Sequence, residues 1–282
     1  MNLAARRKGA ASAAVVAVLM LVLFYPVLRW LAGEWLGNDY YSHGPLVPIV
    51  SAVLAWRLWV NWPPQEKRIE PANAGLILLV GGLAGYLYAL LQRAYFVASL
   101  AMIVLIAGVV WYLLGMAALR RLAFPIGFLV FMVPLPFVEP LSVPMAQLTG
   151  TAAAVAVRLF GVSITISGSQ VTLPNAALVV GAQCSGLRSI VSLLTLVALV
   201  IFVLQGPWWG KVLLALSAIP IAILGNVLRV ASLLVVANIW GADAGFKFYH
   251  DYSSIVFFLS AVALLLLFSR LVKCREIRDD IF

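Results

Sequence analysis

Long apolar runs separated by short polar stretches dominate the chain. Each of eight runs approaches the length that a helix needs to cross the ~30 Å hydrocarbon core of a bilayer. The runs cover residues 12–33, 43–60, 74–91, 94–114, 118–135, 185–204, 211–238 and 254–272. Because backbone polar groups must find partners within lipid, helices are the spanning form that such runs favour. The pattern predicts an all-α polytopic membrane protein with about eight transmembrane helices.

Residues 136–184, between the fifth and sixth runs, do not follow this pattern. Residues 139–160 are rich in alanine and interrupted by two prolines, so we expect them to lie along the interface or to enter the membrane as a re-entrant helix. Residues 162–167 alternate strictly, as a half-buried strand does. Gly168-Ser169 suits a tight turn into a second strand at 170–173. We therefore expect a small β cap ahead of the sixth span.

Composition supports residence in a bilayer. Of the residues, 64% are hydrophobic and only 10% are charged, and the mean hydropathy is +1.07, whereas soluble chains average about 25% charged residues. The net charge of +9 is spread between the apolar runs, with no basic groove interleaved with aromatic residues, which argues against nucleic acid as a partner. We expect residues 1–282 to form a single integral membrane domain.

The distribution of Lys and Arg predicts the orientation. The first apolar run is too long for the core of a signal peptide, so we interpret it as an uncleaved first helix. With the N-terminus inside, most of the 19 basic residues fall on the cytoplasmic side, both termini are cytoplasmic, and 136–184 lies outside. The inner basic residues are Arg6, Arg7, Lys8, Arg57, Lys67, Arg68, Arg120, Arg121, Lys211, Arg270, Lys273, Arg275 and Arg278.

Three residues near the outer boundary are candidates for chemistry: Cys184, Arg229 and His250. Arg229 lies about 27 Å of helix beyond the inner Lys211, and His250 about 34 Å from the inner Lys273. Cys184 precedes a sixth span of about 30 Å. Helix length therefore predicts that the three residues reach a similar depth.

Their chemistry is complementary. A nearby histidine or a helix N-terminus lowers the pKa of a thiol, and Cys184 precedes a helix. His250 is placed to take its proton and return one to a leaving amine. Arg229 lies in a strongly apolar stretch, where a guanidinium is costly and usually functional, and it is suited to stabilising an oxyanion or gripping a carboxylate. These residues favour cysteine-dependent acyl transfer.

Simpler explanations exist for each residue. Free cysteine is often a small core hydrophobe. An interfacial histidine often has no role, and Arg229 is able to extend to the outer headgroups. The common depth is what favours a site over these explanations.

Three further residues are candidates for substrate binding or support: Arg188, Asn226 and His43. Arg188 lies one turn beyond Cys184, and Asn226 shares a helix face with Arg229, which we expect it to orient. His43 begins the second span and either positions substrate or caps the helix. Two histidines and one outward cysteine do not make a normal zinc site, and no phosphate or dinucleotide motif is present, so no metal or cofactor is expected.

Several motifs resemble those of the exosortase/archaeosortase family. They are Gly181-Ala182-Gln183-Cys184-Ser185-Gly186-Leu187-Arg188, Asn226-Val227-Leu228-Arg229-Val230, His250 before the last span, and Tyr41-Ser42-His43-Gly44-Pro45-Leu46-Val47-Pro48. The resemblance covers nearly the whole chain, in span count and motif order. The motif near the second span resembles the N-terminal pattern of bacterial exosortases.

The resemblance implies a transpeptidase embedded in the bacterial inner membrane, with its active site on the periplasmic side. Cys184 would be the nucleophile, Arg229 the essential arginine and His250 the histidine partner. Substrates would be secreted proteins with a tripartite C-terminal sorting signal, in which a Pro-Glu-Pro-like (PEP-CTERM) motif precedes an apolar helix and a basic tail. Members of the family are linked to exopolysaccharide systems. The acceptor nucleophile is left open, and membrane lipid is the other expected partner.

Other functions remain open at this stage. The main alternative is a transporter or flippase in which Arg229 and Arg188 line a path for an anion. A non-enzymatic assembly scaffold and acyl transfer to or from a lipid are further alternatives.

Overall fold

The computed structural model describes residues 3–65, 67, 69–167, 170–179, 181–248 and 252–281. By their internal contacts they divide into two units, Met1–Pro134 and Leu135–Phe282. We describe each unit by itself, and a single membrane domain over 1–282 stays a prediction.

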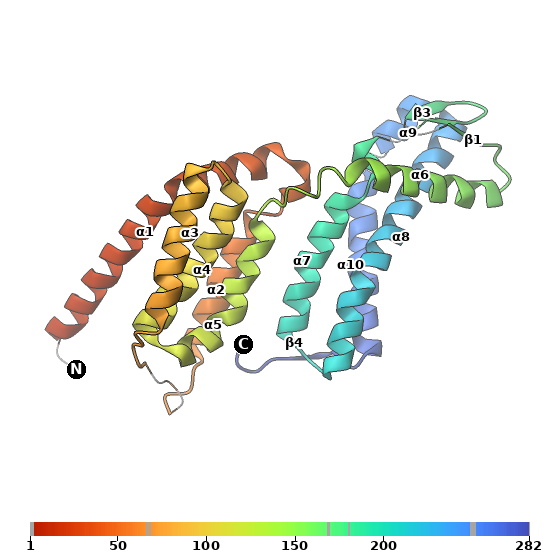
Figure 1. Ribbon diagram of the computed structural model, residues 1–282. Coiled ribbons are helices and arrows are strands. Elements are labelled where there is room, and N and C mark those ends of the chain that lie inside the picture. The colour runs from red at the N-terminus through yellow and green to blue at the C-terminus, as the bar shows by residue number, and fades with distance from the viewer. Residues whose placement is uncertain are drawn as a thin grey trace. The chain divides into compact units, whose positions relative to one another are not determined.

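The described part of the first unit consists of helices (Figure 1). Helix α4 contacts α1, α3 and α5, and α2 packs against α5. The first four predicted spans coincide with helices, and the fifth coincides with α5 and the 3-10 turn η2. The elements are α1 (Leu3–Gly37), η1 (Asp39–Tyr41), α2 (Leu46–Val60), α3 (Gly75–Leu91), α4 (Tyr95–Leu114), α5 (Met116–Phe128) and η2 (Leu129–Met132).

Glycines bring α3 and α4 into close antiparallel contact. A Cβ on Gly108 would lie 2.6 Å from the backbone nitrogen of Leu79, closer than real Cβ atoms approach. Lipid provides no hydrophobic drive for helix association, so close backbone approach at small residues supplies the packing energy instead. The glycines and the residues whose backbone they approach are Gly75 with Tyr112, Gly82 with Leu105, and Gly108 with Leu79.

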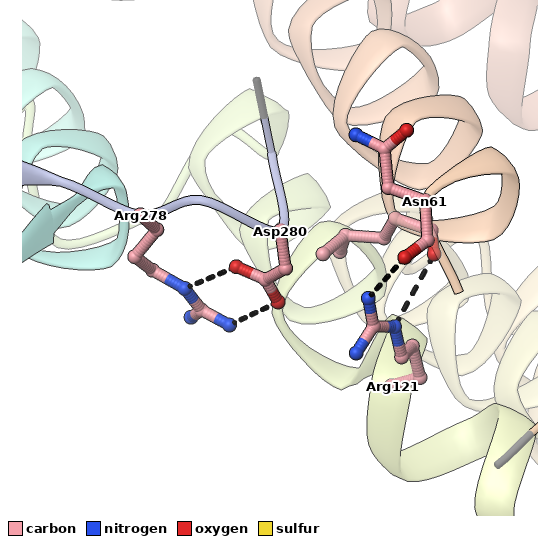
Figure 2. A network of polar contacts seen from close by, with 5 residues as sticks. Asn61, Arg121, Arg278 and Asp280 are labelled. Carbon is pink, nitrogen blue, oxygen red and sulfur yellow. Dashed lines mark hydrogen bonds and ion pairs between the residues drawn. The ribbon is translucent and has the colours of Figure 1, made fainter. Parts of the chain in front are cut away.

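Side chains satisfy several carbonyl groups in this unit. Arg121 of α5 donates from Nε to the carbonyl of Leu58 at 3.2 Å and from a terminal nitrogen to that of Asn61 at 3.4 Å, at the end of α2 (Figure 2). Ser51 donates to the carbonyl of Pro125 at 2.6 Å. These bonds join α2 to α5 through side-chain donors and main-chain carbonyls.

The second unit is built around one long helix, α8, which contacts α6, α7, α9 and α10. Helices α7, α8 and α10 run side by side, and α6 crosses one end of them beside the sheet (Figure 1). Of the two orientations expected for residues 139–160, this crossing favours one along the interface. The elements are α6 (Ser142–Leu159), β1 (Thr165–Ser167), β2 (Gln170–Thr172), β3 (Ala177–Val179), η3 (Ala182–Cys184), α7 (Leu187–Val203), β4 (Leu204–Gln205), α8 (Trp208–Trp240), α9 (Ala242–Phe248), α10 (Ser254–Leu271) and β5 (Glu276–Ile277).

The expected β cap is present as an antiparallel sheet in the order β1-β2-β3. Ser167 lies opposite Gln170, and Thr172 opposite Ala177. The hairpin at 162–173 was expected, although its turn, residues 168–169, lies outside the described residues. The third strand was not expected, because three residues are too few for an alternating pattern.

The opposite end of the second unit is closed by the C-terminal segment. Strand β5 pairs with β4 in the connection between α7 and α8, and Arg278 makes a two-pronged ion pair with Asp280 at 2.8 Å (Figure 2). Cys274 is fully buried there beside Gly206 and Gly210. Burial raises the pKa of its thiol and Lys211 lowers it in part, so Cys274 favours the unreactive thiol.

Within the described residues, four helical segments are long and apolar enough to cross a membrane: Val18–Gly37, Asp39–Val60, Tyr95–Leu114 and Trp208–Trp240. Three shorter apolar helices lie at Gly75–Leu91, Leu187–Val203 and Ile255–Leu271, and α5 has 13 residues. The chain is therefore a mainly helical polytopic membrane protein with a small sheet, and the total of eight spans stays a prediction.

Candidate functional site

Cys184 lies in a tight turn between the sheet and α7. The turn follows β3 through Gly181, whose carbonyl accepts the backbone N–H of Cys184 at 2.9 Å. Gly186 has φ +73° and ψ 1°, a left-handed conformation that glycine adopts without steric cost. Its carbonyl accepts the N–H of Ile190 at 3.0 Å, which begins the hydrogen bonding of α7. Cys184, which is in no disulfide, therefore precedes a helix, as the sequence predicts.

Cys184 is buried among mostly apolar side chains. The residue is 5% exposed, and Ser185 next to it is 1% exposed. Cys184 belongs to a buried cluster contributed by α6, the β sheet and α8, in which Val171 and Leu178 come from the sheet and Val230 from α8. The cap and α6 thus cover Cys184. Electrostatic interactions at a buried position are stronger than in water.

Asn226 of α8 connects this turn to two helices. Its side-chain Nδ2 donates to the carbonyl of Cys184 at 2.8 Å and to the hydroxyl of Thr149 in α6 at 3.3 Å. The side chain is 3% exposed, and within the described residues its Oδ1 accepts no hydrogen bond. The sequence led us to expect that Asn226 orients Arg229. In the structure its amide donates to η3 and α6, and an orienting role toward Arg229 stays a prediction.

Arg229 lies one turn beyond Asn226 on α8 and reaches the start of α10. Its Nε donates to the hydroxyl of Ser253 at 3.4 Å. Ser253 is fully buried and is the N-cap residue of α10. A half-buried guanidinium at this point joins α8 to α10. His250 lies three residues before Ser253 in the sequence and falls outside the described residues.

The two remaining candidates occupy different places. Arg188 is exposed in the first turn of α7. His43 belongs to the first unit, where it follows η1, is half-buried and stacks on Tyr41 with ring centroids 6.1 Å apart. Their functional roles stay predictions.

Metal-ligating side chains do not gather in groups within the described ranges. There, no group of three or more His, Cys, Asp or Glu side chains is placed to hold a metal ion.

Two residues of this arrangement, Thr149 and Ser253, were missed at the level of sequence, and Gly186 was noted only as part of a motif. Gly186 carried a usable signal, since a glycine immediately before a long apolar helix indicates a left-handed entry into that helix. Thr149 and Ser253 carried none, because their hydrogen-bond partners, Asn226 and Arg229, come from an element distant in the sequence.

The family model described as transmembrane exosortase matches residues 30–267. The matched range contains Cys184, Asn226, Arg229 and His250. No curated protein and no solved structure matches the chain.

Proposed function

Because the chain belongs to the transmembrane exosortase family, we propose that it is a membrane-embedded cysteine peptidase and transpeptidase. It acts on secreted proteins whose C-terminal sorting signals resemble the PEP-CTERM type, at the periplasmic face of a bacterial inner membrane. Family membership supports a sorting transpeptidase in the membrane. The nucleophile, the signal and the side of the membrane are the proposal's own content.

One observation carries the assignment of residues. Asn226 and Arg229, one turn apart on α8, contact the Cys184 turn and the N-terminus of α10 respectively. The chain therefore brings a thiol and a guanidinium to one end of the second unit, and His250 immediately precedes α10 in sequence. A structural cysteine would not require a cation in the same neighbourhood.

The proposed reaction begins when His250 takes the proton of Cys184 and the thiolate attacks the scissile carbonyl. Arg229 stabilises the oxyanion of the tetrahedral intermediate. The intermediate collapses, the C–N bond breaks, and His250 returns the proton to the departing amine of the apolar tail. A thioester on Cys184 remains. An acceptor amine or water then attacks this thioester, giving its proton to His250, and releases the sorted protein and the thiol.

The buried position of Cys184 suits this chemistry. The cap and α6 cover Cys184, so a thioester there has limited contact with bulk water before the acceptor arrives. The exposed apolar side chains of α10, Ile255 and Leu259 among them, offer a lipid-facing surface along which a substrate helix is able to diffuse.

Trapping the thioester tests the proposal. Membranes containing the protein are mixed with a reporter that ends in the tripartite signal, quenched in acid and analysed by mass spectrometry. A hydroxylamine-labile acyl group on Cys184 is expected, and a Cys274→Ala variant should still form it. A transporter or scaffold would leave Cys184 unmodified while the reporter is bound, and that result would refute the enzyme.

A further inference from the structure

Asn226 is a polar residue that the proposed reaction does not use. It lies in the interior of an apolar helix at 3% exposure. Burying an amide group without a partner is costly, and its Oδ1 stays without one in the described part of the chain. What the amide does provide is two donated bonds, the shorter of them to the carbonyl of Cys184.

We propose that Asn226 is a positioning residue for the nucleophile. Its amide holds the carbonyl of Cys184 and so fixes the direction of the Cα–Cβ bond that carries the thiol. This inference rests on the proposed function, and it assigns a role that neither the thiol nor the guanidinium performs.

The backbone of Cys184 is held on both sides. Its N–H donates to the carbonyl of Gly181, and its own carbonyl accepts from Asn226. A peptide unit is planar, so a bond to its oxygen orients the whole unit. With both flanking peptide planes fixed, the Cα–Cβ direction of Cys184 is set, and Sγ is restricted to a few staggered rotamers. The peptide unit that contains the carbonyl of Cys184 also contains the N–H of Ser185, which points to the opposite side.

The close approach of Asn226 requires a glycine at position 186, two residues after the cysteine. A Cβ on Gly186 would lie 2.5 Å from Cγ and 2.6 Å from Nδ2 of Asn226. Only a residue without a side chain lets the amide approach the turn, and the φ of +73° has the same requirement. The Cys-Ser-Gly and Asn-x-x-Arg motifs therefore contact each other, through Asn226 and the turn at Cys184. The spacing of the second motif puts Arg229 one turn further along the same helix.

The chemistry of residue 226 makes the proposal testable by pH. Leucine has a similar size and no donor. Aspartic acid donates one O–H bond when protonated and repels the carbonyl oxygen when ionised, so it positions Cys184 at low pH only. Burial raises the pKa of such a carboxyl and a nearby cation lowers it. Among the described residues, the titratable or charged groups at this end of the elements packed around position 226 are Cys184 of η3, Arg188 in the first turn of α7 and Arg229 of α8. From α6, Thr149 contacts Asn226, whereas Arg158 donates to the carbonyl of Ile164.

The experiment measures reporter cleavage by wild type, Asn226→Asp and Asn226→Leu between about pH 5 and pH 8. The leucine variant should lose about tenfold or more in kcat with little change in KM. The ratio of Asn226→Asp to wild-type activity should fall about tenfold as pH rises. Asn238→Asp is the matched control, because Asn238 lies on the same helix with a buried Oδ1 that accepts no bond in the described residues, and its ratio should stay constant.

A second readout separates this inference from the proposed function. In a Cys274→Ala background, the rate of alkylation of Cys184 by iodoacetamide is followed over the same pH range without substrate. Ionisation at Asn226→Asp should loosen the turn, so its alkylation rate relative to wild type should rise with pH. If both ratios are independent of pH, Asn226 does not position the nucleophile. If alkylation responds but the wild type never cleaves the reporter, the positioning contact stands and the proposed function is wrong.

Discussion

At the scale of single residues, position 186 requires glycine for two reasons: its backbone conformation and its packing against Asn226. Its φ is in the left-handed region, which costs other residues roughly 1–2 kcal/mol. Its missing side chain is also the space into which Asn226 reaches. Gly161, with φ +83°, meets only the first requirement, since a Cβ there would have nothing within 4 Å. A comparison of substitutions at the two glycines therefore separates the effect of backbone strain from the effect of contact with Asn226.

Replacement of Gly186 by alanine should reduce cleavage much more than replacement of Gly161. Both variants carry the backbone strain, so both should unfold at a slightly lower temperature in detergent. Only Gly186→Ala displaces Asn226, and its activity should fall by about tenfold or more. In the double variant Gly186→Ala/Asn226→Ala the second change should cost little further activity, because the contact is already lost. Equal activities for the two single variants would argue against the contact.

Arg229 should not be replaceable by lysine. Lysine keeps the charge but has no Nε donor and no planar fork, so we expect Arg229→Lys to lose about tenfold to a hundredfold in kcat/KM. Ser253→Ala removes the partner of one long hydrogen bond and should cost much less. If Ser253→Ala is as damaging as Arg229→Lys, the arginine acts by holding α10 and not on the substrate.

Cys184, Arg229 and Asn226 could be singled out from the sequence because each is a polar group near a membrane boundary, where such groups need a reason. Their contacts could not. Helix length predicts depth along the membrane normal, but it carries no information about which faces of separate helices meet. The pairing of Asn226 with Cys184 instead of Arg229 depends on how α8 is rotated against η3 and α6.

At the scale of elements, α3 and α4 depend on small residues for their packing. The affected positions repeat along one face of each helix, as close approach of two backbones requires. Gly108 packs against the backbone of α3, whereas Gly81, on α3 itself, is exposed, and a Cβ added there would meet nothing within 4 Å. Gly108 and Gly81 are therefore the same residue type in the same kind of helix, and they differ in whether a neighbouring backbone is in contact.

Gly108→Ala should destabilise the first unit by about 1–3 kcal/mol, because the added methyl group forces the two backbones apart. Gly81→Ala should be neutral or slightly stabilising, since alanine is the better helix former. Thermal unfolding in detergent measures both. A Gly108→Ala variant as stable as the wild type would mean that α3 and α4 are not packed this closely.

The elements show the limits of sequence patterns as well. Apolar runs located the helices at all eight expected places, because hydropathy over twenty residues is a strong signal. Strand β3 and helix α9 were not predicted, since elements of three and seven residues are shorter than the windows in which periodicity is visible. Both lie next to the candidate site, where the chain departs from regular spanning helices.

At the scale of the whole molecule, the proposal requires that the sheet and the C-terminal segment lie on opposite sides of the membrane. Within the second unit, the sheet adjoins Cys184, whereas β5 pairs with β4 at the far ends of α7 and α10. The bias of Lys and Arg predicts that β5 is cytoplasmic.

Cysteine labelling tests this orientation. In a background of Cys184→Ala and Cys274→Ala, single variants Gln170→Cys and Glu276→Cys place thiols at exposed positions of β2 and β5. A membrane-impermeant maleimide should label Gln170→Cys in spheroplasts and Glu276→Cys only after permeabilisation. The reverse result would put Cys184 on the cytoplasmic side, away from secreted substrates.

The most direct test of the central claim is tail removal in cells. A secreted reporter with the tripartite signal is co-expressed with wild type, Cys184→Ala or Cys274→Ala, all at matched membrane levels. Loss of the tail, read as a mass shift of the reporter, should occur with the wild type and Cys274→Ala and be absent with Cys184→Ala. If Cys184→Ala removes the tail at the wild-type rate, Cys184 is not the nucleophile.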